Sequence, residues 1–327
     1  MNNKLLFVSG SPHVHHHDSV KKIMWSVVIA LLPAFLVAVY YFGLPVIMIT
    51  TVSIASCLFF EYLIQRFLIK GNSTLGDGSA VITGLLLAFN LPSNIPLWMV
   101  VIGALIAIGV GKMAFGGLGR NPFNPALVGR VFLLISFPVE MTSWPKPVPL
   151  WSFAADAITG PTPLGILSEE VKRGMTIEQL DMPTNIQLLF GQMGGSFGEV
   201  SAIALIVGAL FLLIRKVITW HIPVAFIGSA FLFAAIFHRI DPTIYANPFF
   251  HIITGGLLLG ALYMATDMVT SPTSAMGMLI FGIGCGIITM LIRMFGAYPE
   301  GVSFAILLMN AIVPLLNKAF KPKVFAQ

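Results

Sequence analysis

Ten apolar segments, separated by short polar connections, constrain this chain more than any other feature of its sequence. They span residues 23–42, 44–64, 80–91, 97–115, 125–139, 200–214, 222–237, 249–265, 278–294 and 302–316. About 20 apolar residues cross the hydrocarbon core of a bilayer as a helix. Only 9% of the residues are charged, whereas a soluble domain carries about 25%, so the chain cannot cover itself with a charged surface. The sequence predicts an all-α integral membrane protein with about ten transmembrane helices.

The composition also excludes several kinds of function. Cys57 and Cys285 both lie inside apolar segments and provide neither a disulfide framework nor the spacing of a zinc or iron–sulfur site. The net charge of +5 is spread among short connections, so we expect a lipid bilayer as partner and no nucleic acid. The histidine-dense stretch 11–18 is either a metal-binding tract or, as we favour, part of a polar arm at the membrane surface. We predict no metal site and no catalytic side chain.

The positively charged residues predict how the segments are oriented. In a ten-span arrangement most of those in the connections fall on one side, which the positive-inside rule assigns to the cytoplasm. They are Lys21, Lys22, Arg66, Lys70, Lys112, Arg120, Arg215, Lys216, Lys318, Lys321 and Lys323. Both termini are then cytoplasmic, and the polar segment 142–198 is extracytoplasmic. Arg293, near the outer end of the ninth segment, is the main exception.

This orientation divides the chain into five parts. They are a cytoplasmic arm (1–22), a first membrane repeat (23–141), an extracytoplasmic loop (142–198), a second membrane repeat (199–317) and a cytoplasmic tail (318–327). The two repeats share short sequences in the same order, since 82–88 resembles 253–260 and 115–117 resembles 295–297. Five helices is an odd number, so the repeats would be inverted. Transporters built in this way place their binding site near the midplane, where interrupted helices of the two repeats meet.

The polar run from Asp156 to Leu164 has the composition of a turn. It contains Asp156, Thr159, Gly160 and Thr162 with a proline on each side of the last threonine. Such a turn could present the Thr162 hydroxyl to another molecule, but an ordinary surface loop has the same composition.

Polar residues also stand at the ends of two apolar segments. Asn121 and Asn124 flank a Pro-Phe step before a segment that begins at Pro125, and Asp267 follows the segment 249–265. Asparagine offers donors and acceptors for a neutral ligand such as a flavin ring, but it is also a common helix cap. A carboxylate here is costly in lipid, so Asp267 faces either a cavity or the membrane interface.

These motifs together resemble the family that contains the D subunits of Rnf complexes and, more distantly, the B subunits of sodium-pumping NADH:quinone reductases. The resemblance covers nearly the whole chain. It rests on Ser11-Pro12-His13 and on the stretches 116–126, 156–164 and 265–272.

The resemblance implies two flavins and a urea-transporter-like fold of two inverted five-helix repeats. A threonine at the position of Thr162 carries FMN through a phosphoester bond, within a pattern that here includes Asp156, Thr159 and Gly160. Pro161 departs from the alanine that is usual in the family, which puts recognition by the flavin transferase in doubt and leaves Thr159 as the reserve acceptor. A non-covalent riboflavin would lie near Asn121, Asn124 and Asp267.

The function implied is that of a membrane electron-transfer subunit in the bacterial cytoplasmic (inner) membrane. Its partners would be the rest of the Rnf complex, especially the G subunit with its covalent FMN and the membrane-embedded A and E subunits, together with the flavin transferase. Electron flow between ferredoxin and NAD, both bound by partner subunits, would be coupled to Na⁺ or H⁺ transport. The chain alone would not be a complete enzyme. The alternative is a channel or transporter for a small solute, with the same fold and no redox role.

Overall fold

The computed structural model describes residues 19–70, 74–147, 159–180, 182–191, 193–199, 201–296, 298 and 300–321. The arm that contains Ser11-Pro12-His13, the residue Asp156 and the tail residue Lys323 lie outside the described residues. Within the described part the structure is almost entirely helical, and its one sheet has two short strands. The prediction of an all-α protein is confirmed.

The first half of the chain forms five principal helices and some short turns. These are α1 (Val20–Phe42), α2 (Leu44–Leu63) with its π-helical extension η1 (Ile64–Ile69), the turn η2 (Leu75–Asp77), α3 (Ser79–Phe89), α4 (Leu97–Gly109), the turn η3 (Met113–Phe115) and α5 (Pro125–Ser136). Gly43 separates α1 from α2 with a φ of 67°, a conformation that glycine adopts without strain. Pro125 occupies the first position of α5, where the N–H that proline lacks would have no helical partner.

The polar middle of the chain is built from short elements. They are α6 (Pro138–Met141), β1 (Trp144–Pro145), β2 (Thr159–Gly160), α7 (Pro163–Lys172), η4 (Ile177–Gln179) and α8 (Asn185–Phe190). Strands β1 and β2 pair antiparallel, with Trp144 opposite Gly160. Leucines of α7 and α8 form a small separate core with Phe250, so this segment packs against the second half of the chain.

The second half follows the same order of elements as the first. It comprises α9 (Ala202–Ile214), α10 (His221–Ile240), α11 (Pro248–Ile253), α12 (Leu257–Leu259), the π turn η5 (Gly260–Met264), α13 (Ala275–Phe295) and α14 (Val302–Ala319). Each of the ten apolar segments therefore contains helix. Among the described residues, six helices are long and apolar enough to cross a membrane, namely Val20–Phe42, Leu44–Ile69, Leu97–Phe115, His221–Ile240, Ala275–Phe295 and Val302–Ala319. Three apolar helices are shorter, with 11 to 13 residues, and the segment 249–265 is interrupted.

The interruption between α11 and α12 has a clear local cause. Gly255 and Gly256 have φ values of 69° and 67°, so the backbone leaves the helical conformation for two residues. A Cβ atom on Gly255 would lie 2.1 Å from a methyl carbon of Leu164. The guanidinium group of Arg293 donates to the carbonyl oxygens of His251, Thr254 and Gly255, at 2.5, 2.9 and 2.7 Å. Arg293 thus satisfies carbonyls that the broken helix leaves without helical partners.

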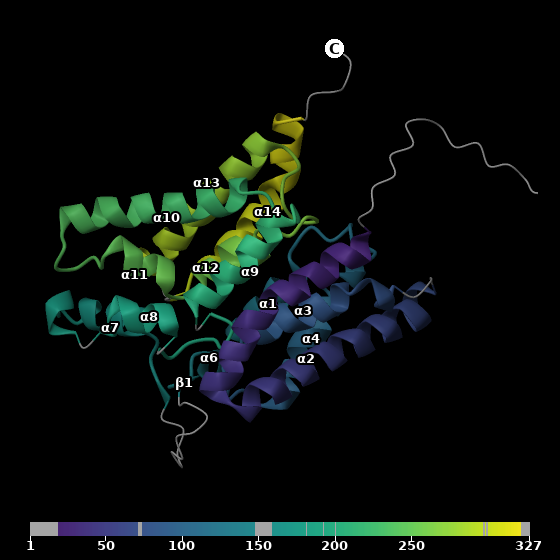
Figure 1. Cartoon of the computed structure of the whole chain (residues 1–327), viewed down its shortest axis with the longest axis horizontal. Helices are drawn as coiled ribbons and strands as arrows, with labels where there is room; N and C mark the ends of the chain where they lie inside the picture. Colours follow the sequence, from purple (N-terminus) through teal and green to yellow (C-terminus); the bar gives the residue numbers. More distant parts are fainter. Residues whose placement is uncertain are drawn as a thin grey trace, which may run out of the picture.

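The two halves pack with matching neighbours. Helix α2 contacts α3 and α4, as α10 contacts α11 and α13, and α4 contacts α5 as α13 contacts α14. Between the halves, α1 packs on α9 and α5 contacts α14. Figure 1 shows the first half in purple and blue beside the second half in green and yellow. In the same view α7 and α8 lie far from the start of α1 and the end of α14, and we call these two ends the α7 end and the terminal end.

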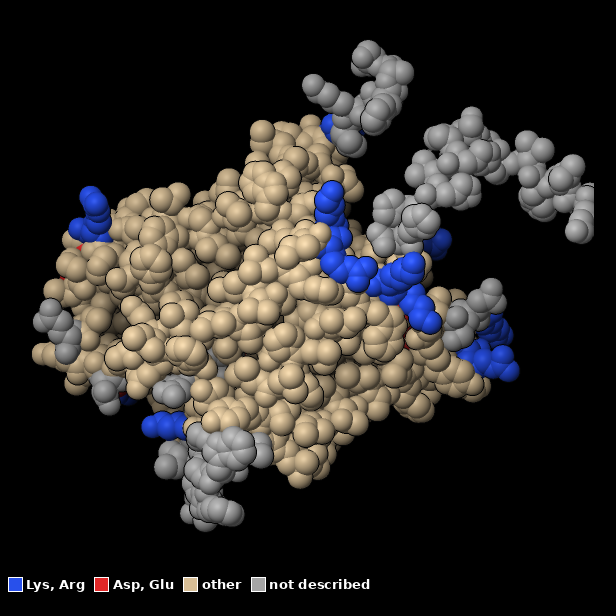
Figure 2. All heavy atoms as spheres, in the orientation of Figure 1, with Lys and Arg blue, Asp and Glu red and all other residues tan. Residues whose placement is uncertain are grey.

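The surface of the helices is suited to lipid. Large apolar side chains are exposed along both halves, with Leu36, Ile135 and Ile214 each more than 60% accessible. In Figure 2 a broad uncharged surface separates most of the visible Lys and Arg side chains, at the terminal end, from a few at the α7 end. This distribution and the six long apolar helices indicate a multi-pass membrane protein.

Candidate functional site

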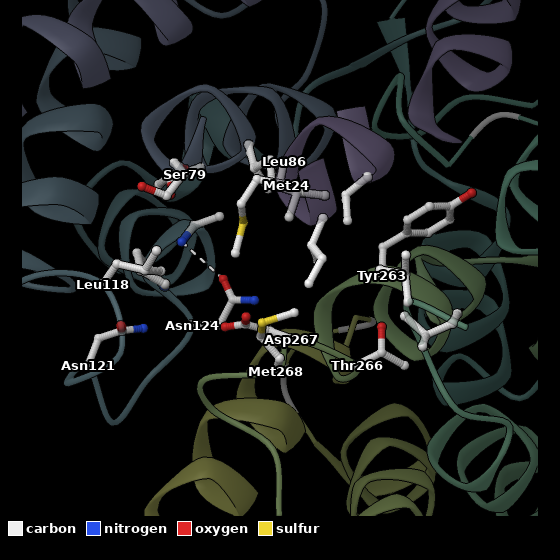
Figure 3. A pocket seen from close by; sticks show the side chains of 18 of the residues that line it. Met24, Ser79, Leu86, Leu118, Asn121, Asn124, Tyr263, Thr266, Asp267 and Met268 are labelled. Carbon is white, nitrogen blue, oxygen red and sulfur yellow. Dashed lines mark hydrogen bonds between the residues drawn. The ribbon is translucent and has the colours of Figure 1, made fainter. Parts of the chain in front are cut away.

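A pocket between the two halves brings the predicted polar residues together. The space between its walls that no atom fills is about 760 Å³, which includes the part that is open to solvent. Its polar lining includes Asn121, Asn124, Thr266 and Asp267, and its apolar lining comes from α1, α3, α9 and the segment around Met268. Figure 3 shows the labelled side chains of Asn121 and Asn124 from the first half and of Asp267 from the second around this space. We call it the core pocket.

Asn121 is the pocket residue best suited to accept a hydrogen bond from a ligand. Its Nδ2 donates to the Phe123 carbonyl oxygen at 3.2 Å. Its Oδ1 is buried and has no hydrogen-bond partner among the residues that the structure describes. An unsatisfied buried carbonyl oxygen costs about 1–3 kcal/mol, so a ligand that donates a hydrogen bond here would remove this cost.

Asn124 has a structural role as well as its place in the pocket. Its Oδ1 accepts hydrogen bonds from the N–H groups of Ala126 and Leu127, which makes it the N-cap of α5. Its Nδ2 donates to the Met264 carbonyl oxygen at 3.2 Å, and its own N–H donates to Asn310 Oδ1 at 3.3 Å. The capping alternative is therefore observed, and Asn124 also joins α5 to the second half.

Asp267 lies partly buried in the turn that follows η5. One carboxylate oxygen accepts from the Val269 N–H at 3.3 Å and the other from the Thr270 hydroxyl at 3.1 Å. Burial raises the pKa of the Asp267 carboxyl, while these two hydrogen bonds lower it. Asp267 can accept hydrogen bonds from a polar ligand in the pocket when it is ionised, and when protonated it can donate one.

A buried ion pair at the pocket wall was not predicted from the sequence. Lys112 Nζ donates to Glu61 Oε2 at 2.6 Å and to the Ser79 hydroxyl at 2.7 Å, and the two charged side chains are 1% and 0% exposed. Lys112 was counted among the positive charges of the connections, but its side chain is buried and paired with Glu61, 51 positions away in the sequence. An isolated Glu in an apolar segment was the one available signal, since such a residue is costly in lipid unless it is paired.

Thr162 lies at the α7 end and is less accessible than expected. It is the N-cap of α7, its Oγ1 accepts from the Gly165 N–H at 3.0 Å, and the residue is only 6% exposed. Thr159 on β2 is exposed. Lys146, which follows β1, lies against Gly160, since a Cβ atom there would be 3.3 Å from its Cε. The positive end of the helix dipole and the nearby lysine side chain favour a phosphate at this place.

A second group of buried charged residues lies toward the α7 end. Arg130 on α5 forms an ion pair with Glu300 and donates to Asn90 Oδ1 and the Ser303 hydroxyl, both at 2.8 Å. Glu199 and Arg293 are 4% and 6% exposed. The burial of Arg293 explains why it departs from the charge pattern: it serves the broken helix rather than a connection between helices.

Comparison with known proteins decides the family. The model of the NQR2, RnfD, RnfE family matches residues 7–326. The D subunit of the Na⁺-translocating ferredoxin:NAD⁺ oxidoreductase complex of Acetobacterium woodii is 43% identical over 99% of this chain and 96% of its own. The chain belongs to the NQR2, RnfD, RnfE family. The resemblance inferred from the motifs is thereby confirmed.

Two further relatives bear on which ion is transported, which the family name does not specify. The D subunit of a proton-translocating ferredoxin:NAD⁺ oxidoreductase complex from Clostridium ljungdahlii is 43% identical over 97% of this chain and 95% of its own. The D subunit of an ion-translocating oxidoreductase complex from Stutzerimonas stutzeri is 42% identical, covering 95% and 93%. Relatives named for Na⁺ and for protons are thus equally similar to this chain, so overall identity does not select the ion.

Proposed function

We propose that this chain is the membrane electron-transfer subunit of an ion-translocating oxidoreductase complex of the Rnf type, with a covalent FMN and a non-covalent riboflavin. The observation that carries the proposal is the core pocket, in which Asn121, Asn124 and Asp267 meet from two halves of a chain with full-length similarity to the D subunits of such complexes. Electron flow between ferredoxin and NAD would be coupled in the complex to Na⁺ or H⁺ transport.

The pocket fits riboflavin in its chemistry. Riboflavin has a flat ring with polar edges and a hydroxylated chain, and the pocket combines apolar walls with amide, hydroxyl and carboxyl groups. The free Oδ1 of Asn121 suits the ring N–H, and Asp267 suits a hydroxyl of the chain. When bound, the flavin would supply the one-electron and two-electron redox chemistry. The protein would orient it and exclude water with side chains such as Leu86 and Met24.

Thr162 is the proposed site of the covalent FMN. A phosphoester oxygen can still accept the hydrogen bond from the Gly165 N–H, so modification is compatible with the cap of α7. The N-terminus of the ten-residue helix α7 and the ammonium group of Lys146 favour the added negative charge. Thr159 is more accessible but lies on β2, away from a helix N-terminus. The electrostatics therefore favour Thr162, while accessibility favours Thr159.

The arrangement of helices supports two inverted repeats of five segments in a fold like that of urea transporters. Within each half, the second helix packs on the third and fourth segments. Between the halves, a two-fold axis would generate contacts such as α1 with α9 and α5 with α14. The three short helices and the interrupted segment then supply the remaining four crossings. Such short elements are tolerated at membrane depth when protein surrounds them.

The charge distribution supports the proposed location. Lys and Arg gather at the terminal end, which would face the cytoplasm, and the α7 end with Thr162 would face outward. That side is where a flavin transferase and the G subunit would meet Thr162, whereas the A and E subunits would contact the exposed apolar helices. The host membrane would be the bacterial cytoplasmic membrane.

Two flavin measurements test the proposal. In-gel fluorescence after SDS denaturation reports covalent flavin, and we expect it to be lost in Thr162→Ala and retained in Thr159→Ala. Acid extraction of the purified complex reports non-covalent flavin, which we expect to fall in Asn121→Ala and Asp267→Ala. Asn94→Ala is the matched control, because Asn94 is an exposed asparagine that donates only to Ser143 among the described residues.

The outcomes separate the candidate functions. A wild-type complex with neither covalent nor extractable flavin would contradict the proposal and favour the solute channel. Fluorescence lost in Thr159→Ala instead of Thr162→Ala would move the attachment site. Unchanged riboflavin content in both core-pocket variants would reject that pocket as the riboflavin site.

A further inference from the structure

The carboxyl group of Glu199 is buried in a way that the proposed electron transfer does not explain. Glu199 lies before α9, outside the long helices, and is 4% exposed. Its Oε1 accepts from the Ser196 N–H at 3.0 Å, but its Oε2 has no hydrogen-bond partner within the described part of the chain. The hydroxyl oxygen of Ser196, also buried, has none there either.

The backbone is shaped around this carboxyl group. A Cβ atom on Gly256 would lie 2.6 Å from Oε2, and one on Gly195 would lie 3.1 Å from Oε1. Side chains at either position would therefore fill the space that the carboxyl group occupies. Gly256 belongs to the break between α11 and α12, so the break lies against Glu199.

Charged groups from several elements face Glu199. Glu300, which precedes α14, raises the pKa of Glu199, and Arg130 on α5 lowers it. Arg293 on α13 is a further neighbour and donates to the carbonyl oxygen of His251, whose own Nδ1 is buried without a partner among the described residues. Burial is the largest influence, and together these effects raise the pKa of Glu199 from 4.5 to about 7.

We propose that Glu199 is a proton-binding site. The proton binds at Oε2 and converts the carboxylate to a neutral acid, with no change of redox state. Glu300, whose side chain is 11% exposed and paired with Arg130, is the negatively charged neighbour that favours this proton.

The surroundings favour a proton over a metal cation. Two guanidinium groups lie near the carboxyl group and would repel Na⁺. A Na⁺ or Ca²⁺ ion also requires several oxygen ligands, whereas the described residues contain no group of three or more His, Cys, Asp or Glu side chains suited to a metal. The buried Oε2 has no hydrogen-bond partner among the described residues and has Glu300 as a negatively charged neighbour, and both features favour a proton there.

The dependence of folding stability on pH gives a direct test. Because the pKa is higher in the folded chain than in an unfolded one, the stabilisation is fully present below about pH 4.5 and is lost as the pH rises through about 7. The folded state would bind this proton about 300-fold more tightly than an ordinary glutamate, since each pKa unit is a factor of ten. The midpoint temperature of unfolding should therefore fall with rising pH in this interval.

The experiment combines infrared pH titration with thermal unfolding of the purified full chain. In wild type we expect a protonated-carboxyl band that disappears with a midpoint near neutral pH. Glu199→Gln should lose that band and the associated pH dependence of unfolding, whereas Glu169→Gln, an exposed change on α7, should alter neither. Glu300→Gln should move the midpoint to lower pH, because it removes the negative charge that raises it.

Three results would overturn the proposal. The first is a band that persists unchanged in Glu199→Gln, and the second is a midpoint at the ordinary value for glutamate. The third is a Glu300→Gln chain whose titration midpoint equals that of wild type. This result decides the question if Glu199→Gln does not fold. None of these readouts depends on flavin, so the result is independent of the proposed cofactors.

Discussion

The ion pair between Lys112 and Glu61 gives the most quantitative prediction. Replacing Lys112 by Met keeps most of the volume and the apolar stem but leaves Glu61 buried without its cation. Removing one partner of a buried pair typically costs about 3–5 kcal/mol. We expect a cost in this range, because both side chains are at most 1% exposed. Among the described residues, Glu61 would then keep its hydrogen bonds from Gln65 and Thr74 alone.

A double-mutant cycle separates the pair from the packing around it. Lys112→Met with Glu61→Gln removes both charges, so the double variant should be more stable than the sum of the single changes implies. For residues in direct contact such coupling amounts to about 0.5–3 kcal/mol, and we expect the upper half of that range for this pair. The measurement is unfolding of the purified chain in detergent, followed by the SDS fraction or the temperature at the midpoint.

An exposed ion pair on the same chain is the matched control. Arg173 donates to Glu170 at 2.6 Å, but the two side chains are 67% and 24% exposed. Arg173→Met should cost less than about 1 kcal/mol, because solvent screens exposed pairs. The reasoning would be refuted if Lys112→Met cost no more than Arg173→Met, or if the changes at Lys112 and Glu61 were strictly additive.

Two further predictions concern topology and the helix break. Glu170→Cys should react with an impermeant thiol reagent added outside intact cells, whereas Lys321→Cys should not. Both native cysteines are buried and should not react. The reverse pattern of labelling would invert the proposed orientation. Gly255→Ala should destabilise the chain by more than 1 kcal/mol (about 1–3 from overpacking alone), because it combines positive φ with a 2.1 Å approach to Leu164. Gly228→Ala inside α10 meets nothing within 4 Å and should be neutral or stabilising; equal effects in a thermal-unfolding assay would reject this account of the break.

The sequence was sufficient to place the apolar helices but not to describe the interrupted one. All ten segments identified from apolar run length contain helix, whereas α7 and α8 lie in the polar segment 142–198 and were not predicted. The eighth segment, 249–265, was predicted as one span because most of its residues are apolar. Its break depends on Gly255 and Gly256 adopting positive φ and on Arg293 donating hydrogen bonds from another helix. Such a tertiary donor cannot be inferred from the segment itself.

Charge was the property for which sequence reasoning was least reliable. Lys112 was counted as a residue of a polar connection, and it is buried. Counting rules assume that a charge near a helix end faces water or headgroups. Whether it does so depends on whether a distant residue, such as Glu61 for Lys112, neutralises it inside the protein.

The candidate site was predicted in part. The repeat argument expected Asn121, Asn124 and Asp267 to converge, and they line one pocket. It did not distinguish their roles, because capping by Asn124 and the free Oδ1 of Asn121 depend on backbone geometry. Riboflavin binding and attachment of FMN to Thr162 stay predictions.

A line of polar contacts connects the two ends of the core. Arg130, beside Glu300, donates to Asn90 Oδ1, and Asn90 Nδ2 lies 3.7 Å from the Met264 sulfur. The Met264 carbonyl oxygen in turn accepts from Asn124 at the core pocket. These contacts run through the protein interior, where the dielectric constant is low and charges interact strongly. A change of charge near Arg130 or at the core pocket therefore acts on side chains that are joined by these contacts.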